Sequence, residues 1–226
     1  MKTSERLMRK KVLKETAARI NKISLHHPVR VGIDGISASG KTTFADDLVT
    51  YLEALGRNVI RASIDGFHNT PEVRYQKGKY SINGYVEDSF NYDAVIDHVL
   101  EPLGPEGELK YKKSQYDFVA SEETKLSHEI ACSNSVLLFD GVMLFNDFIS
   151  HHFDYKIYVD ASFDTIMERA IERDSERLGG EEELMKKYND RYIPGQQFYI
   201  SKHEPHQKAD LIIDNNDYNV PFIRPL

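Results

Sequence analysis

The sequence predicts an α/β fold with a parallel central sheet flanked by helices. Apolar side chains alternate over Val29–Ile33, as they do in a strand, and a glycine-rich loop follows at residues 35–42. After the loop, apolar residues return at helical spacing from Phe44 to Leu52. A further short apolar run, Val136–Phe139, ends in an acidic residue, which is typical of a central parallel strand. Strands that alternate with helices indicate a parallel sheet.

The glycine-rich loop reads Gly-Ile-Ser-Ala-Ser-Gly-Lys-Thr and matches the phosphate-binding pattern G-x-x-x-x-G-K-[ST]. Gly35 and Gly40 let the backbone turn tightly, so that its N–H groups converge on an anion at a helix N-terminus. Lys41 is expected to reach the β- and γ-phosphates and Thr42 to offer its hydroxyl to Mg²⁺. A strand before the loop and a helix after it favour a P-loop NTPase fold over a chance glycine-rich turn. The residues expected to bind the nucleotide phosphates are Gly35, Ser37, Ala38, Ser39, Gly40, Lys41, Thr42 and Thr43.

Length, charge and cysteine content narrow the class of protein. The 226 residues, 40% hydrophobic and 29% charged, fit one domain or one domain with an insertion. A net charge of −7 argues against a nucleic-acid partner, because such proteins usually carry a basic surface. Cys132 is the only cysteine, so an intrachain disulfide is excluded and a reducing compartment is expected. Since no apolar run reaches membrane-spanning length and no signal peptide is visible, we expect no membrane contact and a cytoplasmic location.

The N-terminal segment, residues 1–27, predicts a helix that ends before Pro28. Leu13, Ala17 and Ile20 form one helical stripe within a segment that is rich in Lys and Arg. Such a helix binds a membrane surface or packs on its own domain. Packing is favoured because acidic residues interrupt the basic face.

Residues 58–64 predict the second strand, and Asp65 follows at its carboxyl end. Ligands bind at this edge of open α/β sheets, and a carboxylate there is well placed to accept a proton from a substrate hydroxyl. Asp-Gly is also a turn signal, so position alone leaves a structural role for Asp65 equally open. Residues 69–91 are polar and irregular and predict a long loop or a small substrate lobe.

The middle of the chain predicts short elements. A helix is expected over 93–100, short strands over 109–111 and 114–118, and an extended piece from residue 122. Asp140 ends the strand at 135–141, where it orients Mg²⁺ or plays a structural part.

The C-terminal third predicts a strand at 155–160, a helix from Asp164, a helix over 181–198 broken at Pro194, and a last strand at 209–214. Arg169, Arg173 and Arg177 share one face of the helix that starts at Asp164. These arginines either close over phosphates or pair with the acidic residues beside them, and the spacing alone favours the second. The acidic residues in question are Glu168, Glu172 and Glu176.

In their order along the chain, these landmarks resemble the uridine kinase and phosphoribulokinase family of P-loop kinases, and most closely its uridine kinase-like members. The resemblance runs from about Arg30 to Asn215. It rests on the loop at 35–43, Ile64–Phe67, Tyr116–Val119 with Glu122–Thr124, Leu138–Gly141, Arg169 with Arg173-Asp174, and Tyr192–Pro194 through Ile213. It implies a single P-loop kinase domain over 1–226, with a substrate lobe at about 66–130 and a lid at about 169–195.

The resemblance also implies roles for individual residues. Asp65 matches the general base, and Lys41 and Arg173 match groups that neutralise the transferring phosphoryl group. The lid residues Arg169 and Arg177 are expected on the ATP phosphates. The substrate residues implied are Asp65, Phe67, Tyr85, Tyr116, Phe118, Arg173 and Arg191; the Mg²⁺ residues are Thr42, Asp65 and Asp140.

The sequence departs from the family pattern at four places, of which the first two bear on the substrate. Ser121 stands where nucleoside-reading members have His, and Tyr85 lies near the place of a ribose-binding Asp. Asp140 replaces the usual Glu, and Arg177 is followed by Leu-Gly-Gly where the lid usually carries another Arg. The resemblance therefore implies ATP (or GTP) and Mg²⁺ as cofactors and a small-molecule acceptor, most simply uridine or cytidine. A pantothenate- or sugar-like acceptor, a nucleotide switch without acceptor and a non-catalytic binding protein stay open. Family members are often oligomers, so the resemblance also allows a homo-oligomer.

Overall fold

The computed structural model describes residues 3–117, 122–123 and 127–225. Within them, six strands form the main sheet in the order β10-β9-β8-β1-β7-β2. Five of these strands run parallel, which confirms the predicted parallel sheet, while β10 pairs antiparallel to β9 at one edge. The edge strand β10 was not predicted. The strands are β1 (Val29–Asp34), β2 (Val59–Ser63), β7 (Val136–Gly141), β8 (Tyr155–Asp160), β9 (Leu211–Asp214) and β10 (Phe222–Arg224).

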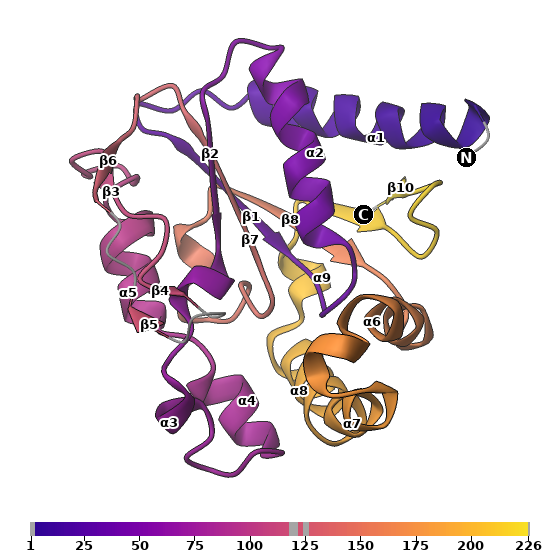
Figure 1. Cartoon of the computed structure of the whole chain (residues 1–226). Coiled ribbons are helices and arrows are strands. Elements are labelled where there is room, and N and C mark those ends of the chain that lie inside the picture. Colours follow the sequence, from indigo (N-terminus) through magenta and orange to yellow (C-terminus); the bar gives the residue numbers. More distant parts are fainter. Residues whose placement is uncertain (1–2, 118–121, 124–126, 226) are drawn as a thin grey trace.

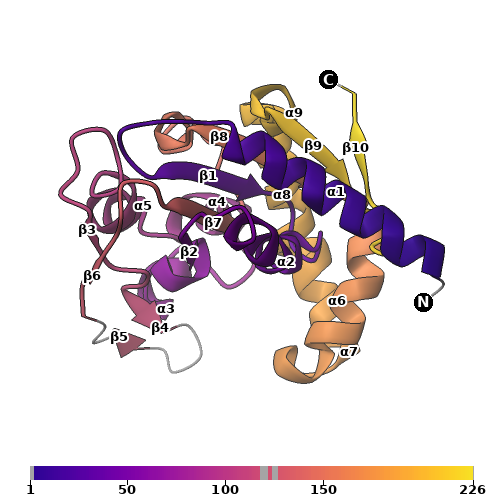
Figure 2. The ribbon, with the colours of Figure 1, turned by 90° about the horizontal axis from the view of Figure 1, so that it is seen from above.

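Helices cover both faces of the sheet and extend beyond its carboxyl edge (Figures 1 and 2). The longer ones are α1 (Thr3–Asn21), α2 (Lys41–Glu53), α6 (Phe163–Leu178), α7 (Glu181–Lys187) and α8 (Ile193–His203). Short helices and turns are η1 (Ile64–Phe67), α3 (Pro71–Arg74), α4 (Ile82–Asp88), α5 (Tyr92–Val95), η2 (Ile96–Leu100), η3 (Ser150–His152), η4 (Tyr188–Tyr192) and α9 (Pro205–Lys208). Two small antiparallel pairs, β3 (Lys110–Tyr111) with β6 (Glu129–Ile130) and β4 (Tyr116–Asp117) with β5 (Glu122–Glu123), lie outside the main sheet.

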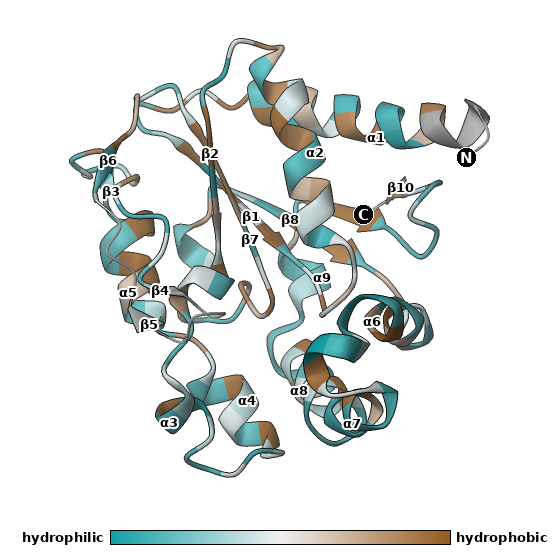
Figure 3. Cartoon of the chain, viewed as in Figure 1, coloured by the Kyte–Doolittle hydropathy of each residue, from teal (hydrophilic) through white to brown (hydrophobic). Residues whose placement is uncertain are grey.

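Strand periodicity divides the core between the two faces of the sheet. Val136 and Leu138 on β7 belong to the cluster beneath α1 and α2, whereas Leu137 and Phe139 belong to the cluster on the opposite face. All four side chains are fully buried. Because helices cover both faces, β7 is apolar from Val136 to Phe139, and Figure 3 shows brown segments along the central strands.

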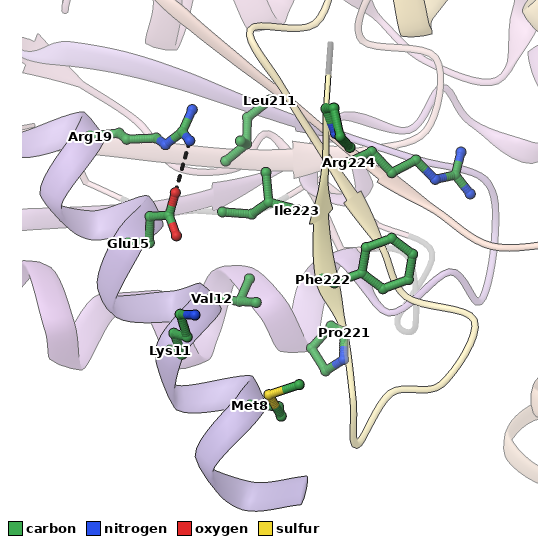
Figure 4. Close-up of a pocket in the computed structure, with 11 residues that line it drawn as sticks. Met8, Lys11, Val12, Glu15, Arg19, Leu211, Pro221, Phe222, Ile223 and Arg224 are labelled. Carbon is green, nitrogen blue, oxygen red and sulfur yellow. Dashed lines mark hydrogen bonds and ion pairs between the residues drawn. The ribbon is translucent and has the colours of Figure 1, made fainter.

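The N-terminal helix α1 packs on α2, which confirms the packing prediction for this segment. Leu13, Ala17 and Ile20 are buried on the face that was predicted, and Arg9 forms a 2.7 Å ion pair with Asp47 of α2. A surface groove of about 480 Å³ separates α1 from β10 (Figure 4), and no residue of the phosphate loop lines it. Among the described residues, none of the helices is both long and apolar enough to cross a membrane.

Residues 69–91 contain two short helices, so of the two predicted alternatives the long loop was wrong, while the small substrate lobe stays a prediction. Pro71 starts α3, where its missing N–H costs nothing. Ser81 caps α4 by accepting a hydrogen bond from the N–H of Gly84. These local caps hold helices too short and too polar to show a clear hydrophobic period.

The helical segment from Glu181 is continuous to His203, so the predicted break at Pro194 does not occur. The chain widens into the π-helical turn η4 just before α8, and Pro194 then occupies the first turn of that helix. A proline in a first turn removes an N–H that has no intrahelical partner, so the helix accommodates it.

Candidate active site

The phosphate loop turns through two residues with left-handed backbone conformations. Gly40 has φ +89° and Ala38 has φ +59°. A Cβ on Gly40 would lie 2.5 Å from Nδ2 of Asn215, and a Cβ on Gly35 would lie 2.4 Å from the carbonyl oxygen of Val159. Gly40 is therefore required by conformation and by space, while Gly35 is required by its close approach to β8.

The helix after the loop begins with N–H groups that have no intrahelical acceptor. α2 starts at Lys41, with Gly40 as its N-cap residue. The N–H of Phe44 donates the first hydrogen bond at this end of the helix, to the carbonyl of Gly40. The N–H groups of residues 40–43 precede that bond and therefore have no intrahelical acceptor. Together with the helix dipole, they form the anion site that the motif predicts.

Arg169 supports the phosphate loop from outside. It donates to the carbonyl of Ser39 at 3.3 Å and to the carbonyls of Asn215 and Asn216 at 2.7 and 3.0 Å. Nδ2 of Asn215 donates to the same Ser39 carbonyl at 2.6 Å. Burial lowers the pKa of Arg169. Arg169 thus contacts backbone around the loop, in contrast to the predicted alternatives of phosphate binding or pairing with neighbouring glutamates.

Lys41 lies among three carboxylates at the carboxyl edge of the sheet. Burial lowers the pKa of its ammonium group, and nearby negative charges oppose that shift. The charges belong to Asp140, Asp65 and Asp34. The Nζ of Lys41 lies 3.4 Å from the carbonyl oxygen of Ile36, within the loop itself. The ammonium is therefore held over the loop, where a bound phosphate would lie.

Asp140 joins the phosphate loop to the sheet. Its carboxylate is buried and accepts hydrogen bonds from Thr42 Oγ1 at 2.6 Å and from Arg61 Nη2 at 2.9 Å. Arg61 also pairs with Asp46 at 2.9 Å. The hydroxyl of Thr42 and the carboxylate of Asp140 are adjacent hard oxygen ligands, the kind that Mg²⁺ prefers. These two residues fit the predicted Mg²⁺ site.

Asp65 lies in η1, directly after β2, and is exposed. Its charge acts on Lys41, Arg173 and His68, because it raises the pKa of each against the effects of burial. Asp65 therefore lies at the edge of the sheet where Lys41 and Asp140 also converge. An exposed carboxylate here is accessible to an acceptor hydroxyl, which the sequence left open against a structural role.

His68 borders the same site and is held in the neutral form. Its ring packs edge-on against Phe90, with centroids 4.6 Å apart, and its Nδ1 lies 3.1 Å from the carbonyl of Asp65. Burial lowers the pKa of His68 to about 4. The ring is consequently uncharged at neutral pH.

Arg173 and Arg177 share one acidic partner, Asp174. Arg173 donates twice to this carboxylate, at 3.1 and 2.7 Å, and Arg177 approaches it to 3.1 Å. Asp174 is 5% exposed, while both arginine side chains are more than half exposed. The predicted pairing with the three glutamates of this helix is not seen, because Asp174 lies between the two arginines on the inner face.

The predicted substrate residues fall in different environments. Phe67 is fully buried against Phe139, with ring centroids 6.3 Å apart, so it packs in the core. Tyr116 lies beside the Asp65 turn, because the neighbouring Gln115 donates to the carbonyl of Gly66. The Tyr116 hydroxyl is buried and has no hydrogen-bond partner among the described residues. Phe118 lies outside the described residues.

Tyr85 of α4 and Arg191 of η4 lie where α4 contacts η4 and α8. The Tyr85 ring lies 5.0 Å from that of Tyr192, and burial raises the pKa of its hydroxyl. Arg191 is 2% exposed and donates to four backbone carbonyls, those of Arg74, Gly78, Lys79 and Ser81. Because these carbonyls occupy its guanidinium, Arg191 ties residues 74–81 to η4.

Sequence reasoning missed four polar residues around the loop: Asp34, Arg61, Gln196 and Tyr199. An acidic residue at the end of an apolar strand was the one signal available, and it applied to Asp34. The other three come from β2 and α8, and only the tertiary structure brings Gln196 and Tyr199 to Ser37 and Asp34, and Arg61 to Asp140.

The fold and this site together define a P-loop kinase: a strand–loop–helix phosphate site with a loop lysine, and carboxylates at the ends of two neighbouring strands. The sequence matches the Phosphoribulokinase / Uridine kinase family over residues 30–220, and the chain belongs to that family.

Relatives that are named uridine kinase or uridine-cytidine kinase match most of the chain. It is 26% identical over 200 residues to uridine-cytidine kinase B of Dictyostelium discoideum, covering 87% of this chain and 79% of the relative. It is 30% identical over 153 residues to the uridine kinase of Leuconostoc citreum, covering 67% and 71%. It is 28% identical over 200 residues to the uridine kinase of Proteus mirabilis, covering 86% and 90%.

Solved structures show the same fold at lower sequence identity. A possible uridine kinase from Bacillus stearothermophilus superposes with a TM-score of 0.72 at 20% identity, over 90% of this chain and 97% of that one. A putative fructose transport system kinase from Silicibacter gives 0.70 at 12% identity, over 84% and 94%. With the family membership, the chain is an ATP-dependent kinase whose acceptor is the hydroxyl of a small molecule.

Proposed function

We propose that this kinase transfers the γ-phosphoryl group of ATP to a hydroxyl of a nucleoside, with uridine or cytidine as the first candidates. The observation that carries the proposal is the convergence of Asp65, Lys41 and Asp140 at the carboxyl edge of the sheet, beside an anion site. The names of the relatives support a pyrimidine nucleoside.

In this proposal Asp65 accepts the proton of the attacking hydroxyl. It is exposed, it follows strand β2 directly, and it lies close enough to Lys41 and Arg173 to influence both. Lys41 and Arg173 then neutralise charge on the phosphoryl group as it moves. Positioning and electrostatic stabilisation account for most of the rate in such transfers.

Thr42 and Asp140 are the residues that would hold Mg²⁺, with Asp65 nearby in η1, directly after the neighbouring strand β2. A bound Mg²⁺ neutralises phosphate charge and orients the phosphoryl group. We further propose that residues of about 66–130 form the acceptor lobe and those of about 169–195 the lid, within one P-loop kinase domain.

A second candidate is a kinase of another small hydroxyl compound, pantothenate- or sugar-like. The burial of Tyr85 favours it: this residue lies near the place of a ribose-binding carboxylate and packs against Tyr192 and Gly195. A side chain held in that contact provides no carboxylate for ribose hydroxyls.

The test is a phosphoryl-transfer screen with ATP and Mg²⁺ against uridine, cytidine, other nucleosides, pantothenate and simple sugars. Asp65→Asn is expected to reduce turnover by about 10²- to 10⁴-fold and to leave ATP binding nearly intact. Asp93→Asn, an exposed acid on α5, serves as the matched control. Transfer only to a non-nucleoside would establish the second candidate. ATP hydrolysis at full rate without any acceptor would contradict both.

A further inference from the structure

We propose that Gln196 and Tyr199 of α8 are positioning residues that hold the first half of the phosphate loop in its nucleotide-binding conformation. This inference rests on the proposed use of residues 35–43 as the phosphate site. It adds to that site two residues from a helix that the loop motif does not contain.

Tyr199 acts on the loop through Asp34. The Asp34 carboxylate is completely buried at the end of β1, where one oxygen accepts the N–H of Gly35 at 2.7 Å. Its other oxygen accepts the N–H of Phe145 at 3.1 Å and the hydroxyl of Tyr199. A buried carboxylate with several donors is restrained in orientation. Tyr199 therefore orients the Asp34 carboxylate, which in turn orients the N–H of Gly35, the first N–H of the loop.

Gln196 acts on the loop directly. Its side-chain oxygen Oε1 accepts the N–H of Ser37 at 2.5 Å, while its Nε2 donates to the carbonyl of Tyr192 at 3.0 Å. The side chain is 1% exposed, so both ends of the amide are engaged in a dry environment. The N–H of Ser37 is consequently committed to Gln196 and not to a phosphate oxygen.

The two contacts work as a pair because of their spacing. Gln196 and Tyr199 are three residues apart on α8, so they lie on one face of the helix. They contact the loop at Ser37 and, through Asp34, at Gly35. Freed from both contacts, the first half of the loop would gain backbone freedom that nucleotide binding must then remove.

The same helix also contacts the proposed acceptor lobe. A Cβ on Gly195 would lie 2.4 Å from the Tyr85 ring, so α4 and α8 meet closely at this glycine. Burial raises the pKa of the Tyr85 hydroxyl, and the Ser37 hydroxyl opposes that shift. α8 thus joins the phosphate loop to the element that carries Tyr85.

The experiment measures binding of ADP and of ATP by calorimetry, without acceptor, to Gln196→Met and Tyr199→Phe. Matched controls are Gln197→Met, the exposed neighbour on the same helix, and Tyr51→Phe on α2. We expect Kd to rise about tenfold in both test variants, equivalent to about 1.4 kcal/mol each. The Tm values should stay with those of the controls. In steady-state assays, the KM for ATP should rise while the KM for the acceptor stays within about twofold.

Two outcomes would overturn the inference. One is an unchanged Kd in both variants, and the other is a Kd that rises only together with a loss of Tm beyond that of the controls, which a merely structural role would produce. Should Gln196→Met not fold, Tyr199→Phe decides alone, since it removes a single oxygen. Because nucleotide binding needs no acceptor, a weakened Kd would support the inference even if the acceptor screen contradicted the proposed function.

Discussion

The guanidinium of Arg61 lies 2.9 Å from Oδ1 of Asp140, the carboxylate whose Oδ2 accepts the hydroxyl of Thr42. A permanent positive charge therefore contacts the buried acid of the proposed Mg²⁺ site. Arg61 comes from β2, the strand next to β7, so the parallel pairing of these strands creates the contact.

Replacing Arg61 by Met should lower the Mg²⁺ concentration for half-maximal activity by about three- to tenfold, because a cation that opposes metal binding is removed. It should also lower kcat, since Asp140 loses a restraint on its orientation. A Mg²⁺ titration at saturating nucleotide measures both. Lys113→Met is the control: Lys113 and Arg61 line one surface cleft, but Lys113 pairs with Glu129. An unchanged Mg²⁺ dependence would remove Arg61 from this role.

Asp174 should position Arg173 and Arg177, two arginines of the proposed lid, for catalysis. Asp174→Asn weakens the two hydrogen bonds from Arg173 and the ion pair with Arg177. We therefore expect kcat to fall about tenfold, equivalent to about 1.4 kcal/mol. Asp164→Asn, an exposed acid in the first turn of the same helix, should leave kcat unchanged. Steady-state kinetics with ATP measures the effect. A rise in kcat or in nucleotide affinity would mean that Asp174 sequesters these arginines.

Arg191 should contribute to stability and to acceptor binding, because it holds the backbone of residues 74–81, part of the proposed acceptor lobe, through four carbonyls. Lys cannot reproduce the planar fork of donors, so Arg191→Lys should destabilise the fold by about 2–3 kcal/mol. Urea unfolding measures the change in the free energy of unfolding. Arg173→Lys serves as the comparison, because the side chain of Arg173 is more exposed. We also expect a higher KM for the acceptor. Wild-type stability in Arg191→Lys would contradict this structural role.

His68 should make stability fall between about pH 6.5 and pH 4. Burial lowers its pKa to about 4 in the folded chain, against about 6.5 when unfolded, so in this range only the unfolded chain binds the proton. The stabilisation is complete above the unfolded pKa and is lost as pH falls through the folded pKa. From pH 7 to pH 5 the loss from His68 should be about 2 kcal/mol.

Urea unfolding of the wild type and of His68→Gln at pH 7 and pH 5 measures this contribution. The variant should lose less stability over this interval, while His26→Gln, an exposed histidine, should follow the wild type. Equal pH slopes in all three chains would show that His68 titrates normally.

Local pattern determined the main elements of this protein. The alternation of Val29, Val31 and Ile33, the glycine loop and the apolar run of β7 predicted the strand–loop–helix unit and the parallel sheet, because side-chain period depends on backbone geometry alone. The stripe of Leu13, Ala17 and Ile20 predicted the packed face of α1 for the same reason. The positions of Asp65 directly after β2 and of Asp140 near the end of β7 placed both carboxylates at one edge of the sheet.

Only the tertiary structure decided which polar groups meet. Arg61 contacts Asp140 across neighbouring strands, and Gln196 contacts Ser37 over a separation of 159 residues. Arg173 and Arg177 pair with Asp174, and Arg191 donates to backbone carbonyls of residues 74–81. Hydrogen-bond partners depend on three-dimensional proximity and on burial, which strengthens these bonds and leaves no local periodic signature. The sequence by itself determined the phosphate loop and its sheet, while the fold decided what holds that loop in place.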